Sequence, residues 1–252
     1  MLDEVVRSER LQSLAFWTTD QCLVVPGSYL KKPFFHSAAA RSSAEGWPVF
    51  ARETGGDVVP QGSGILNISF ALRSPETVET VYRMLCDPIG SLIPRGIADT
   101  RCATVPGSFC DGRFNVAAGG RKLAGTAQRW KSITSPSGVR AVFAHALLLV
   151  DADIQSGIDA INRFYQYCGL EQRITADAHI NLSELIDIAS GDSGLARLVR
   201  ELEPKYKTTL EHAHSPPATA PWTHGKHSEP LRTHFPLDSD PVKKDYVRYE
   251  IH

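Results

Sequence analysis

The fold of this chain is decided by the stretch Gly107-Ser-Phe-Cys-Asp-Gly-Arg-Phe-Asn-Val-Ala-Ala-Gly-Gly-Arg-Lys-Leu-Ala-Gly-Thr-Ala-Gln128. It holds one cysteine, Cys110, and one lysine, Lys122, and small residues surround the lysine. Glycines and alanines at this density suit a loop in which the backbone approaches a ligand closely better than they suit a core strand or helix. The stretch therefore predicts a binding loop whose lysine meets a charged or carbonyl-bearing substrate. Two simpler interpretations stay open, a solvated hairpin lysine and a packed thiol.

The elements around this stretch predict a sheet with helices packed on it. Residues 114–118 and 121–127 form a hairpin that turns at Gly119-Gly120, a strong local turn signal. Further strands are expected at residues 21–25, 48–52, 64–72 and 139–150. Helices are expected at 1–14, 38–44, 74–89 with Ser74 as the N-cap, 155–168, 182–189 and 195–202. Irregular alternation with hairpins favours an α/β (α+β) fold with a mixed, mostly antiparallel sheet over a doubly wound parallel sheet.

The C-terminal tail differs from the rest of the chain. From residue 211 to residue 252 it carries six of the nine histidines and six prolines. One interpretation is a metal site built on His212 and His214 or on His224 and His227. The other is an extended arm over the domain, which we favour because no acidic or cysteine partners stand at ligand spacing. We therefore expect a domain over residues 1–205, a Pro/His-rich arm over 206–252, no metal, and a terminal strand within 242–252.

Composition excludes several classes of protein. Hydrophobic content of 42% and charged content of 22% are ordinary for a folded domain, and a net charge of −1 gives no nucleic-acid footprint. No apolar run approaches the roughly 18 residues of a membrane span. No basic-then-apolar leader opens the sequence, so a cytoplasmic location is expected by default. The five cysteines lack disulfide or zinc spacing, which indicates reduced thiols.

A second glycine-rich segment, Arg52-Glu-Thr-Gly-Gly-Asp-Val-Val-Pro-Gln-Gly-Ser-Gly64, follows an expected strand. Successive backbone N–H groups in such a loop form an anion-binding nest. The segment lacks Gly-Lys-Ser/Thr and a directly following helix, so it is neither a P-loop nor a dinucleotide fingerprint. A plain glycine-rich hairpin is the alternative.

The order of these motifs resembles the lipoate–protein ligase and octanoyltransferase family, whose fold is shared with biotin–protein ligase catalytic domains. The family pattern is Arg-x-Ser/Thr-Gly-Gly-Gly, then Gly-Arg-Lys-Ile-x-Gly-x-Ala, then His-Gly-Ser/Thr-Leu-Leu. Here these motifs stand at 52–57, 120–127 and 145–149, and the resemblance covers residues 14–170. Three positions depart from the pattern: Asp57 replaces the third glycine, Ala146 replaces a glycine, and Gln61 stands where many ligases carry histidine.

The resemblance implies a site. Lys122 is implied to contact the acyl carbonyl, and the loop from Arg52 to Gly64 to line the acyl and phosphate channel. The implied substrate-binding residues are Arg52, Thr54, Gly55, Gly56, Asp57, Gly64, Asn115, Gly125, Thr126, Ala127 and His145. A core histidine is the alternative for His145.

Cys110 separates two activities. In one octanoyltransferase branch a Gly-Ser-Tyr/Phe-Cys-Pro-Gly segment supplies a nucleophilic cysteine, and residues 107–112 resemble it with Asp111 in the proline position. A lysine ammonium near the thiol would favour the reactive thiolate and stabilise an oxyanion, whereas an Asp111 carboxylate facing the sulfur would oppose thiolate formation.

Three functions follow from the resemblance. The leading hypothesis is an acyltransferase that moves an octanoyl or lipoyl group through a Cys110 thioester to a lysine of a lipoyl-domain or glycine-cleavage H-type protein. An acyl carrier protein is a possible donor, and no cofactor is needed. The second is an ATP- and Mg²⁺-dependent lipoate–protein ligase that uses Lys122 and no cysteine. The third is a non-catalytic module that binds acyl carriers. Neither nucleic acid nor membrane is expected as a partner, and a biotin ligase is disfavoured because its Gly-Arg-Gly-Arg loop is absent.

Overall fold

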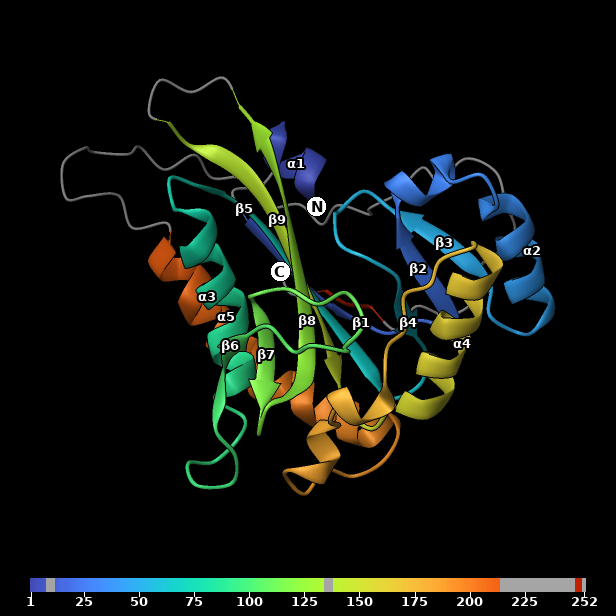
Figure 1. The fold of residues 1–252 in the computed structure, drawn as a ribbon. Helices are drawn as coiled ribbons and strands as arrows, with labels where there is room; N and C mark the ends of the chain where they lie inside the picture. Colours follow the sequence, from blue (N-terminus) through green and yellow to red (C-terminus); the bar gives the residue numbers. More distant parts are fainter. Residues whose placement is uncertain (8–11, 134–137, 214–247, 251–252) are drawn as a thin grey trace.

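The computed structural model describes residues 1–7, 12–133, 138–213 and 248–250 and is built on two sheets (Figure 1). Seven antiparallel strands form the larger sheet, in the order β10 (Arg248–Glu250), β1 (Gln12–Trp17), β5 (Ile65–Ser74), β9 (Arg140–Leu149), β8 (Arg121–Ser132), β7 (Asn115–Ala118) and β6 (Thr100–Ala103). The smaller sheet has the order β3 (Val49–Arg52), β2 (Cys22–Pro26) and β4 (Val59–Gln61), with β2 and β3 parallel. The expected mixed, mostly antiparallel sheet with packed helices is confirmed.

Two hydrophobic cores lie on the two sides of the larger sheet. Helices α3 (Val78–Gly90) and α5 (Asp192–Ala213) pack together over one face (Figure 1). Helices α2 (Phe35–Ala44) and α4 (Ile154–Tyr167) enclose the second core with the smaller sheet. Strand β5 is buried on both faces for this reason: residues 66, 68, 70 and 72 face the α3–α5 core, whereas Asn67 exchanges two hydrogen bonds with Gln61. The site lies where the second core meets the end of the larger sheet.

Several elements differ from the sequence expectation. Helix α1 (Leu2–Val6) is short, and the helix expected over residues 1–14 is wrong beyond it, because Leu14 and Phe16 alternate inward from strand β1. The N-cap of α3 is Thr77, whose hydroxyl accepts the Thr80 N–H, and not Ser74.

The helix expected over residues 182–189 is also wrong. It is reduced to a 3-10 turn, η3 (Leu182–Glu184), which follows two further turns of this type, η1 (Gly27–Lys31) and η2 (Ala176–Ala178). Asn181 caps η3, and its side-chain amide also bonds both backbone groups of Ala152. These bonds fix the segment to the end of β9 and leave no continuous helical face.

Helix α5 crosses the boundary expected between the domain and the arm. Helix α5 runs unbroken across residues 205 and 206, and Tyr206 and Leu210 are buried in the core. Strand β10 falls inside the range expected for a terminal strand. Residues 214–247, with four of the tail histidines, lie outside the described part of the chain. Within the described ranges, no helix combines the length and the apolar character that crossing a membrane requires.

Candidate functional site

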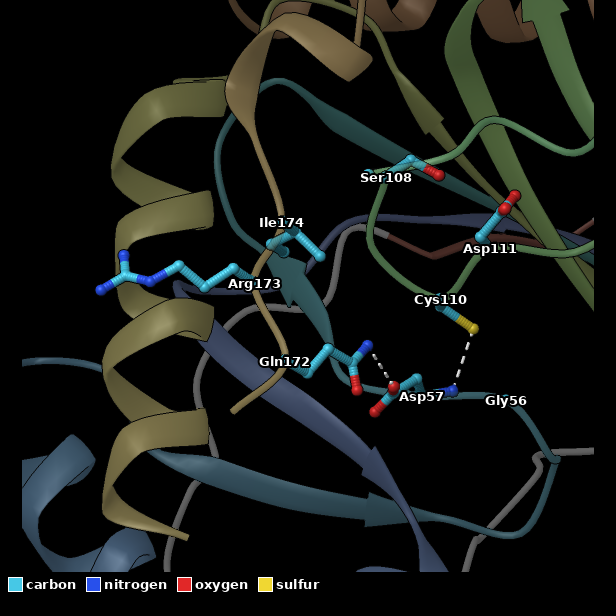
Figure 2. A pocket seen from close by; sticks show the side chains of 9 residues that line it. Gly56, Asp57, Ser108, Cys110, Asp111, Gln172, Arg173 and Ile174 are labelled. Carbon is cyan, nitrogen blue, oxygen red and sulfur yellow. Dashed lines mark hydrogen bonds between the residues drawn. The ribbon is translucent and has the colours of Figure 1, made fainter. Parts of the chain in front are cut away.

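Cys110 lies in the connection between β6 and β7, residues 104–114, which we call the cysteine loop. Its backbone has φ of 44°, and among the described residues it is the one non-glycine with a positive φ. Such a conformation costs about 1–2 kcal/mol for a residue with a side chain, and strained residues of this kind cluster at functional sites. The side chain opens on a pocket of about 450 Å³ (Figure 2). Three segments line it, with residues Gly56, Asp57, Gly107, Ser108, Cys110, Asp111, Gln172, Arg173 and Ile174.

The cysteine loop is braced by Asp111. One carboxylate oxygen accepts the Val105 N–H at 2.7 Å and the Asn115 side-chain amide at 2.7 Å. Figure 2 shows the Asp111 carboxylate pointing away from the Cys110 sulfur. Asp111 therefore shapes the loop from within and does not face the sulfur, and Asn115, expected to bind substrate, contacts the Asp111 carboxylate.

The sulfur of Cys110 meets donors from the other glycine-rich segment. The backbone N–H of Asp57 points at Sγ from 3.0 Å, and Nη2 of Arg52 lies 3.8 Å from Sγ. A backbone N–H and a guanidinium cation are therefore both directed at this sulfur. The two motifs that lie 58 residues apart in the sequence thus meet at one sulfur atom.

Arg52 and Asp57 hold this connection in place. Arg52 donates to the carbonyls of Val24, Gly55 and Asp57. The Asp57 carboxylate accepts from the Tyr29 hydroxyl and its own neighbour's amide, and its second oxygen accepts from Gln172 at 3.0 Å. The residue that replaces the third glycine of the family pattern is therefore the anchor that aims its own N–H at Cys110.

Lys122 lies beneath the cysteine loop and is fully buried. Its ammonium donates to the carbonyls of Phe109 at 2.5 Å and Cys110 at 3.0 Å, and it lies 4.4 Å from the centre of the Phe109 ring. Burial lowers the pKa of Lys122 to about 8, while Cys110 and Asp111 act in the opposite direction. A Cβ on Gly125 would lie 3.1 Å from Cε of Lys122, so this glycine makes room for the lysine side chain. In this structure Lys122 supports the backbone of the cysteine loop.

His179 is a site residue that the sequence analysis missed. Its Nε2 accepts the Phe109 N–H at 3.1 Å, its ring stacks on Phe109 at 4.7 Å, and Nδ1 lies 2.9 Å from the Thr175 carbonyl oxygen. Because Nε2 is the acceptor, Nδ1 carries the proton and the ring is neutral. Burial, with Lys122 next, lowers the pKa of His179 to about 4. The segment 176–182 carries no motif of its own, and tertiary contacts such as the bridge between His179 and Lys122 bring it to the loop.

His145 and Thr54 form a second pair. Thr54 Oγ1 lies 2.9 Å from Nε2 of His145, which joins β9 to the segment after β3. Burial lowers the pKa of His145 to about 4, and the Arg52 cation acts in the same direction. The ring is therefore neutral near pH 7 and orients the segment that carries Arg52 without adding charge.

The remaining expected residues lie apart from the sulfur. Gly64 packs on the backbone of Asp151, where a Cβ would clash, and Ala127 pairs with His145 across strands β8 and β9. Thr126 donates to the Phe114 carbonyl. With Asn115, Thr126 lines a second pocket of about 300 Å³ against α3, whose lining residues are Val78, Tyr82, Gly112, Arg113, Phe114, Asn115 and Thr126.

Two buried polar atoms at the site have no hydrogen-bond partner in the described part of the chain. They are the Ser108 hydroxyl, on the wall of the pocket beside Cys110, and Nε of Arg52. Buried polar groups are rarely left unpaired, and such an atom is suited to bind a polar ligand atom. Among the described residues no group of three or more His, Cys, Asp or Glu side chains is arranged to hold a metal ion.

Comparison with known proteins identifies the family. The family model of the lipoyl protein ligase A/B catalytic domain matches residues 1–189. The chain belongs to this family. The resemblance drawn from the three motifs is confirmed. In this lipoyl ligase family member, the motif at 52–57 lies beside Cys110 and the motif at 120–127 lies beneath it.

Individual relatives of this lipoyl ligase family member are consistent with that assignment. An uncharacterized protein of Cupriavidus necator is 41% identical over 165 residues, which is 60% of this chain and 64% of that protein. An octanoyl-GcvH:protein N-octanoyltransferase of Kyrpidia tusciae is 33% identical over 205 residues, 79% of this chain and 69% of that protein. The chain thus spans about two thirds of the length of these curated relatives. The crystal structure of lipoate–protein ligase A bound with ATP has a TM-score of 0.60 at 18% identity, covers 83% of this chain and 78% of that chain, and shows the common fold.

Proposed function

We propose that this chain is an acyltransferase that carries an octanoyl or lipoyl group as a thioester on Cys110 and delivers it to a protein lysine. The observation that carries the proposal is the environment of the sulfur. It faces a pocket, receives the Asp57 N–H at 3.0 Å and lies 3.8 Å from the Arg52 guanidinium. A nucleophilic cysteine needs a partly accessible, electropositive setting of this kind. Cys110 is partly exposed, whereas Cys22, Cys86 and Cys168 are buried.

The transfer divides into two balanced steps. The Cys110 thiolate attacks the acyl carbonyl carbon, and the bond between that carbon and the donor breaks. A thioester donor leaves as a thiolate, and an amide donor leaves as an amine that takes up the proton given up by the Cys110 thiol. The acceptor amine then attacks the Cys110 thioester, its proton is lost, and the thiolate is regenerated.

The surrounding residues have separate parts in this proposal. The Asp57 N–H and the Arg52 guanidinium stand near enough to the sulfur to stabilise the oxyanion that forms on the acyl oxygen. Ser108 lies on the wall of the same pocket. Lys122 and His179 fix the carbonyl and the N–H of Phe109, so they position Cys110 through the backbone. Lys122 acts as a positioning residue, and its positive charge beneath the loop also stabilises the oxyanion.

The partners are proposed from the names of relatives. Those names give octanoyl-GcvH as one substrate and a protein as the other. A GcvH-type protein is therefore the first donor or acceptor to test. An acyl carrier protein loaded with octanoate is the second donor. The transferase needs no cofactor.

The deciding experiment is intact-protein mass spectrometry after mixing the chain with octanoyl-GcvH or octanoyl-acyl carrier protein. We expect one octanoyl group on the chain, released by hydroxylamine as a thioester is, and its transfer to a lipoyl domain added later. The Cys110→Ser variant should lose transfer by a factor of at least about 10³, because covalent catalysis is removed. A Cys102→Ser variant, which removes an exposed thiol outside the pocket, is the matched control and should transfer normally. Full-rate transfer by Cys110→Ser would overturn the cysteine mechanism.

Two other functions give different outcomes in the same assay. A ligase would acylate the lipoyl domain from free lipoate or octanoate only when ATP and Mg²⁺ are present, and Cys110→Ser would keep that activity. If the chain is a binding module, both the wild type and the Lys122→Ala variant should bind the acylated carrier, and neither should produce an acylated lipoyl domain. Running the reaction with and without ATP therefore separates all three.

A further inference from the structure

Two cysteines outside the site face each other across α3 and β6. A Cβ on Gly90 of α3 would lie 3.5 Å from Cγ2 of Thr100 on β6, which fixes how the helix and the strand are aligned. Cys86 precedes Gly90 by four residues, about 6 Å along a helix, and Cys102 follows Thr100 by two residues, about 6.6 Å along a strand, on the same face. The two side chains therefore lie at the same level of the contact, and each thiol shifts the pKa of the other.

The two thiols differ in exposure and in acidity. Cys86 is buried, with Sγ 3.6 Å from the Phe114 carbonyl oxygen, whereas Cys102 is exposed. Contact with Cys86 lowers the pKa of Cys102 to about 7; burial and Asp87 oppose this, and Arg83 supports it. The same contact, together with burial, raises the pKa of Cys86. An exposed acidic thiol beside a buried protonated thiol is the arrangement of an attacking and a resolving cysteine.

We propose that Cys86 and Cys102 form a redox-sensitive pair that closes to a disulfide by exchange with a small-molecule disulfide such as oxidised glutathione. The Cys102 thiolate attacks one sulfur of the small disulfide, forming a mixed disulfide and releasing one thiolate. Cys86 then gives up its proton and attacks the Cys102 sulfur, which releases the second thiolate. In sum, two protein thiols are oxidised and one small-molecule disulfide is reduced to two thiols.

The location of the pair connects it with the cysteine loop. Cys102 lies on β6 directly before that loop, and Cys86 contacts Phe114 at its end. A disulfide would tie α3 to β6, the edge strand of the larger sheet in the described part of the chain. The two linked cysteines would then lie near the two ends of the loop that carries Cys110. The oxidation itself does not depend on which reaction the chain catalyses.

The test is to map the thiols after incubation of the full chain with oxidised glutathione. The protein is then denatured, free thiols are alkylated with iodoacetamide, and the chain is cut with trypsin and chymotrypsin, so that cleavage after Phe109 separates Cys102 from Cys110. We expect Cys86 and Cys102 to lose alkylation to equal extents and to appear in one cross-linked pair of peptides that dithiothreitol separates. Cys22 and Cys168 should remain alkylated.

Two variants check the order of attack. In Cys86→Ala, glutathione should remain attached to Cys102, because no resolving thiol is present. In Cys102→Ser, Cys86 should stay reduced, because it is buried. The proposal fails if wild-type Cys102 ends as a stable glutathione adduct, cross-links to Cys110, or stays fully alkylated under conditions that modify Cys110.

Discussion

Gly56 is the residue on which the geometry at Cys110 depends most directly. Its φ is +107°, and a Cβ placed on it would lie 2.5 Å from the Cys110 sulfur and 3.0 Å from Nη2 of Arg52. No real Cβ lies as close as 2.5 Å to another atom, so a side chain at this position must displace either the Cys110 sulfur or the Asp57 N–H that is directed at it. Gly55, one residue earlier, has nothing within 4 Å of the corresponding position.

Gly56 and Gly55 allow a matched comparison in which each variant adds one methyl group. Gly56→Ala should lower the rate of Cys110 alkylation by iodoacetamide at pH 7, and of acyl transfer, by at least about tenfold, or about 1.4 kcal/mol. The reason is the steric clash together with a left-handed backbone that costs a non-glycine residue about 1–2 kcal/mol. Gly55→Ala should stay within about twofold of wild type. Equal rates for the two variants would show that the sulfur is not held as described.

The sequence located the residues at this scale but did not reveal all of their contacts. Cys110, Lys122 and Arg52 were expected from motifs, and they do lie around one loop. Lys122 was expected to be the cation near the thiol, yet the group on the sulfur is Arg52, and Lys122 bonds the carbonyls of residues 109 and 110. Motif spacing shows which residues converge, whereas donor directions depend on backbone dihedral angles such as the positive φ of Cys110.

Among the elements, α5 bears on where the domain ends, because it continues past residue 205 to Ala213. Tyr206 is fully buried, donates its hydroxyl to the Leu85 carbonyl at 2.6 Å, and packs edge-on against Phe16 with ring centres 6.0 Å apart. It ties α5 to both α3 and β1. We propose that the domain extends through Ala213 and that the arm begins after it.

Substitutions on α5 test this placement. Tyr206→Ala should lower the free energy of unfolding by about 3–5 kcal/mol, as truncation of a buried aromatic side chain does, and Tyr206→Phe by about 1 kcal/mol through the lost hydrogen bond. Thr208→Ala, exposed on the same helix, should change it by less than about 0.5 kcal/mol. The measurement is urea unfolding of the full chain. A Tyr206→Ala variant as stable as Thr208→Ala would place residue 206 outside the domain.

Elements with a clear periodicity were predicted well, and those fixed by tertiary contacts were not. The glycine hairpin at 119–120 and helix α4 follow local signals that the structure keeps. Strand β1 was missed because Leu11 and Leu14 stand at helical spacing in the sequence, and only the pairing of β1 with β5 decides between helix and strand. The helix expected at 182–189 failed because Asn181 bonds Ala152, a contact far along the chain that no local pattern reveals.

For the whole molecule, two neutral histidines, the buried His179 and the half-buried His145, predict that stability depends on pH in the acid range. His145 and His179 have pKa values lowered to about 4 in the folded chain, against about 6.5 when unfolded. Between these values the unfolded chain binds protons that the folded chain does not, so stability must fall as the pH falls from 6.5 to 4. Each histidine contributes a slope of about 1.4 kcal/mol per pH unit. Lys122 stays protonated in both states across this window.

Urea unfolding at several pH values between 4.5 and 6.5 checks the prediction. His179→Gln should reduce the slope of unfolding free energy against pH by about 1.4 kcal/mol per unit. His36→Gln, which changes an exposed histidine of α2, should leave the slope as in wild type. An unchanged slope in His179→Gln would mean that the buried ring takes up a proton without unfolding.

A protein that carries an activated acyl group runs the risk of modifying itself, since any free amine beside a thioester is a target for aminolysis. Lys122 is close to Cys110 and has a pKa low enough to supply neutral amine in mildly alkaline solution. Its nitrogen is nevertheless sealed from the pocket, with no exposed surface and with two backbone carbonyls accepting hydrogen bonds from it. In the proposed transferase, burial beneath the loop keeps this nitrogen from attacking the thioester, so the acyl group stays available for the amine of another protein.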